Sequence, residues 1–476
     1  MKRQNIWSIA GALALLTAAL PAAGADLLSV YDQALENDPQ IREAEATRRA
    51  DIEARPQAWA NLMPGLTASA SKNKSWSDGT GYSQFTFGNS TTPTTSIQDG
   101  KGATKTTQWS LQIRQTLFSM QNFVALSSSN RVVAQAEANY TYAQQQLVQR
   151  VAQQYFAVLQ AQDTVRAQEA ARDAFARQFE QAEQRYNVGL YAITEMQEAR
   201  AARDNAAANV IGAKRSLASV EEQLRATIGD LPDSLHEAAA DMPLMAPDPA
   251  SQDDWVNMAL DQNANLVSQS LAADIARDNV RSAYGTFAPE ISLNAGKTFS
   301  DTSGHRTQPG TPPDPDVYTT NASKTHGKSI GLSFSMNLNG LGYGNSSRAT
   351  QAQQRWIAAK ERLERVTRDT ERQTRDAYLG IISDIARVQS YRQALESSRT
   401  ALTATEAGME VGTRTIVDVL NSRQQLIQAE TSYSSAKYQY LNDLISLQLA
   451  AGSLDRSTLE EINGWLTEPA PAAPTP

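Results

Sequence analysis

The sequence predicts a mainly helical α+β fold, in which long antiparallel coiled-coil hairpins alternate with strand pairs. Three observations predict this fold: seven-residue apolar spacing over very long segments, short segments of alternating apolar and polar side chains, and an internal repeat offset by 223–225 residues. Seven-residue spacing indicates coiled-coil helices, whereas two-residue alternation indicates strands with two different faces. The chain is therefore expected to contain two copies of one arrangement of helices and strands.

The repeat sets the expected domain boundaries. Gly189 recurs as Gly412, 223 positions later, and Pro64 recurs as Pro289, 225 positions later. The two prolines mark expected helix-to-strand transitions, and further prolines mark a linker in which neither helix nor sheet is expected to continue. The expected parts are a signal peptide at 1–25, a first repeat at 26–231, a linker at 232–252, a second repeat at 253–454, and a C-terminal segment at 455–476 with a disordered Ala/Pro tail.

The leader and the composition indicate an exported protein. The first 25 residues contain Lys2 and Arg3, an apolar run and an A-x-A cleavage signal, which predicts a signal peptide and a mature start at Asp26. The chain has 43 basic and 51 acidic side chains, which argues against a nucleic-acid surface, and no cysteine, which excludes disulfides and thiolate sites. No later apolar run reaches the ~20 residues of a spanning helix, so a membrane-spanning form would use strands.

The helical segments are expected to form hairpins. The apolar seam of the first long helix runs from Val151 to Tyr186 at seven-residue steps, with Arg172 as the exception, and that of the second runs from Ile381 to Met409. Continuous helices over 122–187 and 346–411 would each be about 100 Å long. Each is followed by a tip, expected at 187–195 and 410–418, and by a returning helix.

The two tips share a chemical pattern. In each, Gly189 or Gly412 is expected at the left-handed position that ends the first helix. An acid, Glu195 or Asp418, then falls in the first turn of the next helix, where the helix dipole favours negative charge. Helix stability alone explains one such acid, but its recurrence at one register favours a functional role.

Four strands are expected, at about 65–76, 106–118, 290–300 and 328–339, with polar loops at 77–105 and 301–328. Alternation such as Trp109, Leu111 and Ile113 against polar neighbours is typical of transmembrane barrel strands. A soluble sheet with one buried face alternates in the same way, but the leader favours the barrel. Four strands cannot close a barrel, so this interpretation requires an oligomer, either a dimer with eight strands or a trimer with twelve.

No catalytic or metal-binding constellation is present in the sequence. His236, His305 and His326 fall in predicted linker or loop segments without metal-ligand spacing. Gly327-Lys328-Ser329 resembles the end of a phosphate-binding loop, but Ala322 stands where that loop requires glycine. Paired carboxylates are expected only on solvated helix faces. We therefore expect no cofactor, no metal and no enzymatic activity.

The tip segments carry a family resemblance. Tyr186–Leu190 with Ala192–Thr194, the run Val411–Leu420, and the two prolines resemble the TolC family of trimeric outer-membrane export ducts, over nearly the whole mature chain. The resemblance implies a homotrimer with a twelve-stranded barrel in the outer membrane, continuous with a helical tunnel in the periplasm. It also implies type I protein secretion or multidrug efflux, in which an inner-membrane ABC or RND/MFS pump delivers substrates through a periplasmic adaptor protein that docks on the tips.

The same resemblance implies a gate at the tips. Arg414 would tie the second hairpin to Thr194 and Glu195, and Asp418 from each protomer would line the constriction. This chain departs from the family twice, because Met409 replaces a tyrosine that links the hairpins and Asn421 replaces a second ring carboxylate. One carboxylate ring, weaker cation binding and one fewer hydrogen bond in the closed state are therefore expected.

Two other classes of protein compete with the duct. A structural coiled-coil surface protein explains the heptads but leaves the two-faced strands without a role. A general porin explains the strands but needs no helices of about 100 Å. The residues do not specify which substrate is exported or by which pump.

Overall fold

The computed structural model describes residues 24–85, 88, 94–239, 242–308 and 315–467. Residues 1–23 of the predicted signal peptide and the predicted tail at 468–476 therefore lie outside the described residues. The chain divides into two compact units. Unit 1 contains the residues up to Thr47, Ala138–Val267 and the residues from Glu364 onward, and unit 2 contains Arg48–Glu137 and Ser268–Leu363.

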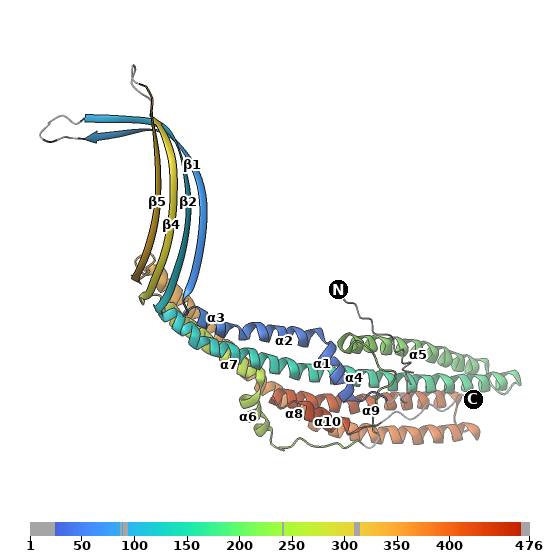
Figure 1. Cartoon of the computed structure of the whole chain (residues 1–476). Coiled ribbons are helices and arrows are strands. Elements are labelled where there is room, and N and C mark those ends of the chain that lie inside the picture. The colour runs from blue at the N-terminus through green and yellow to red at the C-terminus, as the bar shows by residue number, and fades with distance from the viewer. Residues whose placement is uncertain (1–23, 86–87, 89–93, 240–241, 309–314, 468–476) are drawn as a thin grey trace, which may run out of the picture. The chain divides into compact units, whose positions relative to one another are not determined.

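The chain is mainly helical, with antiparallel strands (Figure 1). The long helices α4 and α8 have 68 residues each, and they begin two and three residues before the predicted starts. The helices are α1 (Leu27–Asn37), α2 (Pro39–Ile52), α3 (Ala54–Ala60), α4 (Met120–Asn187), α5 (Ile193–Ile228), α6 (Gln252–Gln262), α7 (Ala264–Gly285), α8 (Tyr343–Glu410), α9 (Ile416–Ala451) and α10 (Arg456–Asn463).

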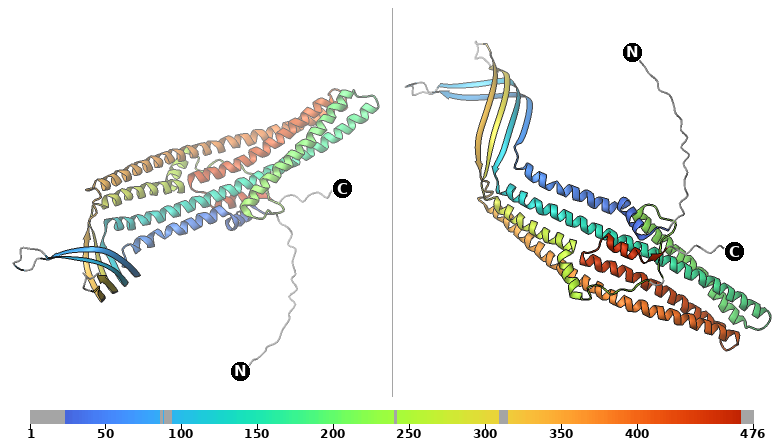
Figure 2. Two further views of the ribbon diagram at one scale, coloured as in Figure 1. Left: turned by 90° about the horizontal axis from the view of Figure 1, so that it is seen from above. Right: turned by 60° about the horizontal axis from the view of Figure 1, so that its bottom comes forward.

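In unit 1, the α4–α5 hairpin lies beside the α8–α9 hairpin (Figure 2). The predicted heptad residues Val151, Val158 and Ile381 are each at most 1% exposed, as coiled-coil packing requires. Tyr186 departs from this pattern, because it lies at the tip and is 37% exposed. Aromatic side chains fill the widest part of the core, where Phe156 of α4 stacks on Tyr438 of α9 at 6.1 Å between ring centroids.

The expectation that the linker at 232–252 forms no sheet is wrong. Its residues Glu237–Ala238 form β3, which pairs with β6 (Leu466–Thr467) from the C-terminal segment. Tyr155 of α4 donates a hydrogen bond to the His236 carbonyl at 2.8 Å and so holds this segment against the helices. A two-residue strand whose partner lies some 230 residues away leaves no periodic signal in the sequence.

Unit 2 contains one antiparallel four-stranded sheet in the order β1-β2-β4-β5 (Figure 1). Pro64 and Pro289 directly precede β1 and β4. The strands are β1 (Gly65–Phe85), β2 (Thr94–Phe118), β4 (Glu290–Gln308) and β5 (Val317–Ser335).

The prediction that residues 77–105 and 301–328 form loops is wrong for most of these residues, because all four strands continue into them. His305 and His326 accordingly lie in β4 and β5 rather than in loops. The apolar alternation stops in these extensions, but their backbone groups still pair in the ladder, which does not depend on side-chain polarity. β5 also ends at Ser335 rather than at 339, before a turn in which Gly340 and Gly342 have positive φ.

The register gives the sheet two different faces. Directly opposed residues project from the same face of a sheet. Apolar residues oppose one another across neighbouring strands, as Leu66 opposes Ile113 and Ala295 opposes Ile330. We call the resulting surface the apolar face; its side chains include Leu66, Ala68, Ala70, Trp109, Leu111, Ile113, Leu293, Ala295, Phe299, Ile330, Leu332 and Phe334. The opposite polar face carries Ser, Thr, Asn, Gln and Gly, for example Ser69, which is hydrogen-bonded to Ser110 at 2.8 Å.

The apolar face is uncovered in the single chain. Leu66, Leu332 and Ile330 are 66%, 68% and 79% exposed. An exposed apolar surface of this extent indicates a contact with another apolar phase or chain. None of the helices in the described part of the chain is both long and apolar enough to cross a membrane.

Gly452 provides a test of the packing of unit 1. It ends α9 with φ of 79°, and a Cβ placed on it would lie 2.5 Å from the Gln262 carbonyl oxygen. Gly452→Ala is expected to destabilise the fold by ~1–2 kcal/mol because of the left-handed backbone alone. The overlap of the new Cβ with the Gln262 carbonyl oxygen is expected to add to this loss. The measurement is the midpoint of thermal unfolding in detergent.

Gly212 is the matched control for Gly452. It lies within α5, and no atom lies within 4 Å of the position that a Cβ would take there. Gly212→Ala is expected to stabilise the helix by about 0.5–1 kcal/mol. Equal effects of the two substitutions would contradict the packing described for Gly452.

Candidate functional site at the helical tips

Both tips are built around a left-handed glycine. Gly189 has φ of 77° and Gly412 has φ of 80°. The Leu190 N–H donates to the Arg185 carbonyl at 2.8 Å, and the Thr413 N–H donates to the Gly408 carbonyl at 2.8 Å. These bonds span five residues and close the helix ends in the same way, which is the Schellman arrangement. The two tips thus share one backbone geometry.

Asp418 caps the helix that follows the second tip. The Thr415 N–H and Oγ1 donate to Asp418 Oδ2 at 2.9 and 3.0 Å, and the Asp418 N–H donates to Thr415 Oγ1 at 3.2 Å. This reciprocal pair is a capping box, which satisfies free N–H groups of the first turn. The hydrogen bonds from Thr415 hold the pKa of Asp418 below its ordinary value, and nearby Arg414 acts in the same direction. Asp418 is therefore ionised at neutral pH and fixed in position.

The first tip carries only half of this arrangement. Glu195 accepts a hydrogen bond from the Ala192 N–H at 3.2 Å, but Ala192 has no side-chain oxygen to return it. Thr194 is exposed beside it. Within this chain, the described residues show no hydrogen bond or ion pair between Arg414 and either Thr194 or Glu195.

Arg414 lies exposed between the tip glycine and the α9 cap. Its backbone N–H donates to the Gly408 carbonyl at 3.1 Å. A Cβ on Gly408 would come within 2.8 Å of Arg414 Cγ, so Gly408 makes room for the arginine stem. The guanidinium group is thus directed by the backbone of its own tip.

Met409 holds the two hairpins together by packing. It lies against a buried cluster of Ala182, Ala199 and Ile416, which come from α4, α5 and α9. Gln178 of α4, 7% exposed, donates a hydrogen bond from Nε2 to Met409 Sδ at 3.7 Å. A thioether is a weak acceptor, so the contact is mainly apolar. The sequence alone did not indicate Gln178, because a glutamine within a heptad has no distinctive spacing.

Asn421 lies exposed on α9, one turn after Asp418. It lines a cavity of ≈ 440 Å³ between the hairpins, together with Asn205, Asn209 and Glu198 of α5. Residues three apart on a helix lie on neighbouring positions of one face, so Asp418 and Asn421 belong to one polar strip of α9.

Two arginine contacts at the tips, one hydrogen bond and one ion pair, have no distinctive signal in the sequence. Arg185 donates from Nη1 to the Tyr191 hydroxyl at 2.6 Å across the first tip. Arg423 of α9 forms an ion pair with Glu406 of α8 below the second tip. Arg423 matches Arg200 at the repeat offset, but only the fold reveals its partner. These contacts stiffen each hairpin separately.

Apolar side chains project from the tips into solvent. Val188, Leu190 and Val411 are 70%, 74% and 75% exposed. Their burial would contribute about 1.5–3 kcal/mol for each side chain. The tips therefore present an unsatisfied apolar surface beside the charged residues.

No group of three or more histidine, cysteine, aspartate or glutamate side chains in the described segments could hold a metal ion. Titratable groups at the tips are instead used for caps and ion pairs.

Comparison with known proteins identifies the chain. The sequence model of the family described as "Outer membrane efflux protein" matches residues 30–230 and 255–453. The chain belongs to the outer membrane efflux protein family. It is 32% identical over 453 residues to the outer membrane protein TolC of Escherichia coli (strain K12), covering 94% of this chain and 86% of that protein. The family resemblance drawn from the tip motifs is thus confirmed.

Another relative and two solved structures are also similar to this chain. The chain is 30% identical over 468 residues to the alkaline protease secretion protein AprF of Pseudomonas aeruginosa, covering 97% of this chain and 91% of that protein. Its fold matches the outer membrane protein VceC of Vibrio cholerae with a TM-score of 0.68 at 20% identity, covering 90% and 96% of the two chains. The Campylobacter jejuni CmeC outer membrane channel matches with a TM-score of 0.68 at 17% identity, covering 98% of each chain. This efflux family protein is an outer-membrane channel protein for secretion or efflux.

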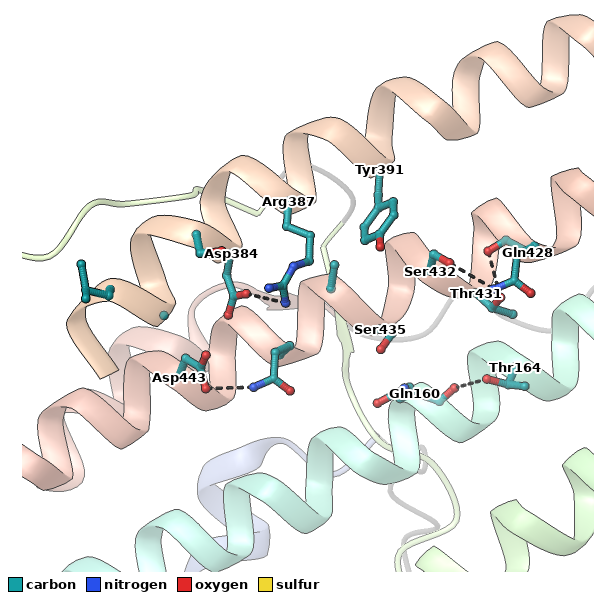
Figure 3. Close-up of a pocket in the computed structure, with 15 residues that line it drawn as sticks. Gln160, Thr164, Asp384, Arg387, Tyr391, Gln428, Thr431, Ser432, Ser435 and Asp443 are labelled. Atoms are coloured by element: carbon teal, nitrogen blue, oxygen red, sulfur yellow. Dashed lines mark hydrogen bonds and ion pairs between the residues drawn. The ribbon is translucent and has the colours of Figure 1, made fainter. Parts of the chain in front are cut away.

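A second polar feature of this efflux family protein lies in unit 1, far along the helices from the tips. Asp384 of α8 and Asp443 of α9 point toward one another beside a cavity of ≈ 820 Å³ (Figure 3). Asp384 is 2% exposed and accepts from Arg387 at 2.9 Å, while its Oδ2 has no hydrogen-bond donor. Asp443 lies against Gly380, where a Cβ would be 3.0 Å from Oδ2. The expectation that paired carboxylates occur only on solvated faces is wrong here, because α8 and α9 bring together residues that are distant in sequence.

Asp384 holds its proton more tightly than an ordinary aspartate does. Burial, followed by the hydrogen bond and the charge of Asp443, raises the pKa of Asp384 from 3.8 to about 6, although Arg387 opposes the shift. The charged and titratable side chains that line this cavity are Asp384, Arg387, Tyr391 and Asp443. Because the folded state binds the proton more tightly, this stabilisation is complete below about pH 3.8 and is lost as the pH rises through about 6.

Asp384→Asn is expected to remove this part of the pH dependence, because the amide donates to Asp443 without titrating. The measurement is the urea midpoint of unfolding between about pH 4 and pH 7. Asp376→Asn is the control, since Asp376 is a 64% exposed carboxylate of α8 paired with Arg372. If the urea midpoint of Asp384→Asn changes with pH as it does in the wild type, the raised pKa of Asp384 is contradicted.

Proposed function

We propose that this protein is the outer-membrane duct of a tripartite export system, acting as a homotrimer in type I secretion or multidrug efflux. It conducts substrates passively from an inner-membrane ABC or RND/MFS pump and a periplasmic adaptor to the outside, and it has no enzymatic role. The observation that carries the proposal is the four-stranded sheet, with its uncovered apolar face, its polar face and its two edge strands.

The sheet supports assembly into a closed barrel. In the order β1-β2-β4-β5, the outer edges of β1 and β5 lack a strand partner in the described chain. Open edges are not tolerated in lipid, because unpaired backbone groups each cost several kcal/mol there. Four strands are too few to close, whereas three copies supply twelve. The polar face then lines an aqueous lumen, and the apolar face contacts lipid.

The internal two-fold repeat is part of the same proposal. The family's sequence model matches the chain twice, over 30–230 and 255–453. The shared backbone geometry at Gly189 and Gly412 adds support. Two copies per protomer and three protomers give six hairpins around the duct.

We infer that the tips form the periplasmic gate. Asp418 is fixed and ionised by its cap, so three copies around an axis concentrate negative potential on the narrowest point. Arg414 is exposed and makes no bond to Thr194 or Glu195 within the described part of its own chain, so it is available to those residues of a neighbouring protomer. A guanidinium–carboxylate bond of this kind is charge-assisted and resists opening.

The adaptor is proposed to dock on the same tips. Val188, Leu190 and Val411 offer exposed apolar anchors next to charged residues. Interfaces typically combine a small apolar centre with a polar rim. This arrangement would couple adaptor binding to the Arg414 link.

Removal of the Arg414 link tests the gate. Arg414→Ala is expected to raise the single-channel conductance of the purified protein in a planar bilayer severalfold, because the closed tips lose a charge-assisted bond. Arg177→Ala, which removes an exposed arginine from α4, is the control. An unchanged conductance in Arg414→Ala would contradict the proposed gate. If the purified protein formed no channel at all, the proposed duct function would be contradicted.

The number of carboxylates in the ring can be tested separately. Asp418→Ala is expected to abolish block of the channel by a trivalent cation added on the tip side. Asn421→Asp restores the second ring carboxylate. The trivalent cation is then expected to block the channel at a severalfold lower concentration than it does in the wild type. Asn205→Asp on α5, which lines the same cavity as Asn421, is the matched control and should block as wild type does.

A further inference from the structure

The lysines of the four strands all lie on one face of the sheet. Side chains alternate between faces along a strand, and the register places every lysine on the apolar face defined above. The polar face has Arg114, paired with Glu290 at 2.9 Å, and Arg306, but no lysine. The lysines concerned are Lys72, Lys74, Lys101, Lys105, Lys297, Lys324 and Lys328.

Two pairs of these lysines are directly opposed across neighbouring strands. Lys74 of β1 opposes Lys105 of β2, and Lys297 of β4 opposes Lys328 of β5. Opposed residues have Cβ atoms roughly 4.5–5.5 Å apart, and like charges at that spacing destabilise a sheet. A sheet that carries two such pairs needs an anion to offset the repulsion.

The described carboxylates of this face do not supply that anion. Asp78 lies 3.7 Å from Lys101, and Asp301 lies 3.8 Å from Lys324. Among the described side chains, the remaining five lysines have no carboxylate partner, and all five are exposed. We call Lys72, Lys74, Lys105, Lys297 and Lys328 the lysine belt.

The lysine belt recurs in both halves of the chain. Lys72 and Lys297 are 225 residues apart, as Pro64 and Pro289 are. Lys105 and Lys328 are 223 residues apart, as the two tip glycines are. The same offsets govern the strands and the tips, so the lysines keep equivalent places in the two strand pairs.

On β1 and β5, the belt lysines lie where the apolar run on this face ends. On the apolar face of β1, Leu66, Ala68 and Ala70 are followed by Lys72 and Lys74. On β5, Phe334, Leu332 and Ile330 are followed by Lys328.

Aromatic rings lie among the belt lysines. Lys74 Nζ lies 4.9 Å from the Trp76 ring centroid, and Lys297 Nζ lies 5.8 Å from that of Trp109. Lysine stems and aromatic rings beside an apolar band are typical of a membrane–water interface.

We propose that the lysine belt binds the phosphate groups of anionic membrane lipids. The inference rests on the proposed function, because it takes the apolar face to contact lipid. Opposed lysines can approach one phosphate from two sides, and each hydrogen bond to it is charge-assisted. The lipid chains of the same molecule then cover the adjacent apolar side chains. The alternative is that each lysine only extends its charged end into water. That alternative does not explain why the lysines directly oppose one another in pairs.

The test measures lipid binding to the full-length protein in detergent by native mass spectrometry. Phosphatidylglycerol is expected to bind in preference to phosphatidylcholine. In the double variant Lys105→Gln with Lys328→Gln, phosphatidylglycerol should bind about 25-fold more weakly, since each lysine near an anionic surface contributes roughly fivefold. The control, Lys101→Gln with Lys324→Gln, removes the two paired lysines of the same face and should change binding little.

Three outcomes separate the possibilities. Equal loss in the test and control variants would overturn the belt as a specific site. Displacement of the lipid by millimolar inorganic phosphate would overturn the lipid as its occupant and indicate a simple anion site. Channels of normal conductance from a variant with unchanged lipid binding would refute the belt and leave the proposed duct intact, whereas absence of channels in the wild type would refute the duct itself.

Discussion

The unpaired edges of β1 and β5 are the constraint on which the rest of this structure depends. A strand edge in water can bond to solvent, but an edge beside an uncovered apolar face has no such partner once that face enters lipid. In the proposed trimer, closure with other copies would remove both edges at once. The alternation of apolar and polar residues would then separate a surface that contacts lipid from a surface that contacts water. The proposed role of the lysine belt depends on the same separation, because the belt would bind lipid phosphates beside the apolar side chains.

At the tips, one short motif serves stability and electrostatics together. The carboxylate of Asp418 accepts two hydrogen bonds from Thr415, so its charge stabilises α9 and is held in a fixed position, as the proposed gate requires. Arg414 is different, because among the described residues only its backbone N–H makes a hydrogen bond. In the proposed gate, the Arg414 link could therefore break without loss of the hydrogen bonds that end the helix. Glycine at 412 makes this compact turn possible.

Sequence patterns predicted the helices and turns that follow a local repeat. They did not predict contacts between residues that are distant in sequence. Heptads located α4 and α8 to within three residues, and the tip glycines located both turns. The strand ends were misjudged because Ser, Thr and Gly give no alternation, although their backbones pair. The Gln178–Met409 contact and the Asp384–Asp443 pair could not be predicted, since each joins helices whose relative register only the fold determines.

The family resemblance implies a hairpin-linking tyrosine where this chain has Met409, and in the gate proposed above Met409 would link the hairpins by apolar packing instead. Met409 packs on Ala182, Ala199 and Ile416, a buried apolar cluster contributed by α4, α5 and α9. Burial of a thioether side chain contributes about as much as one neutral hydrogen bond or more. Such packing is insensitive to salt, whereas ion pairs are screened. With Asn421 also uncharged, the closed state proposed above would rely more on apolar contact at Met409, and Arg414 would be its main charged link.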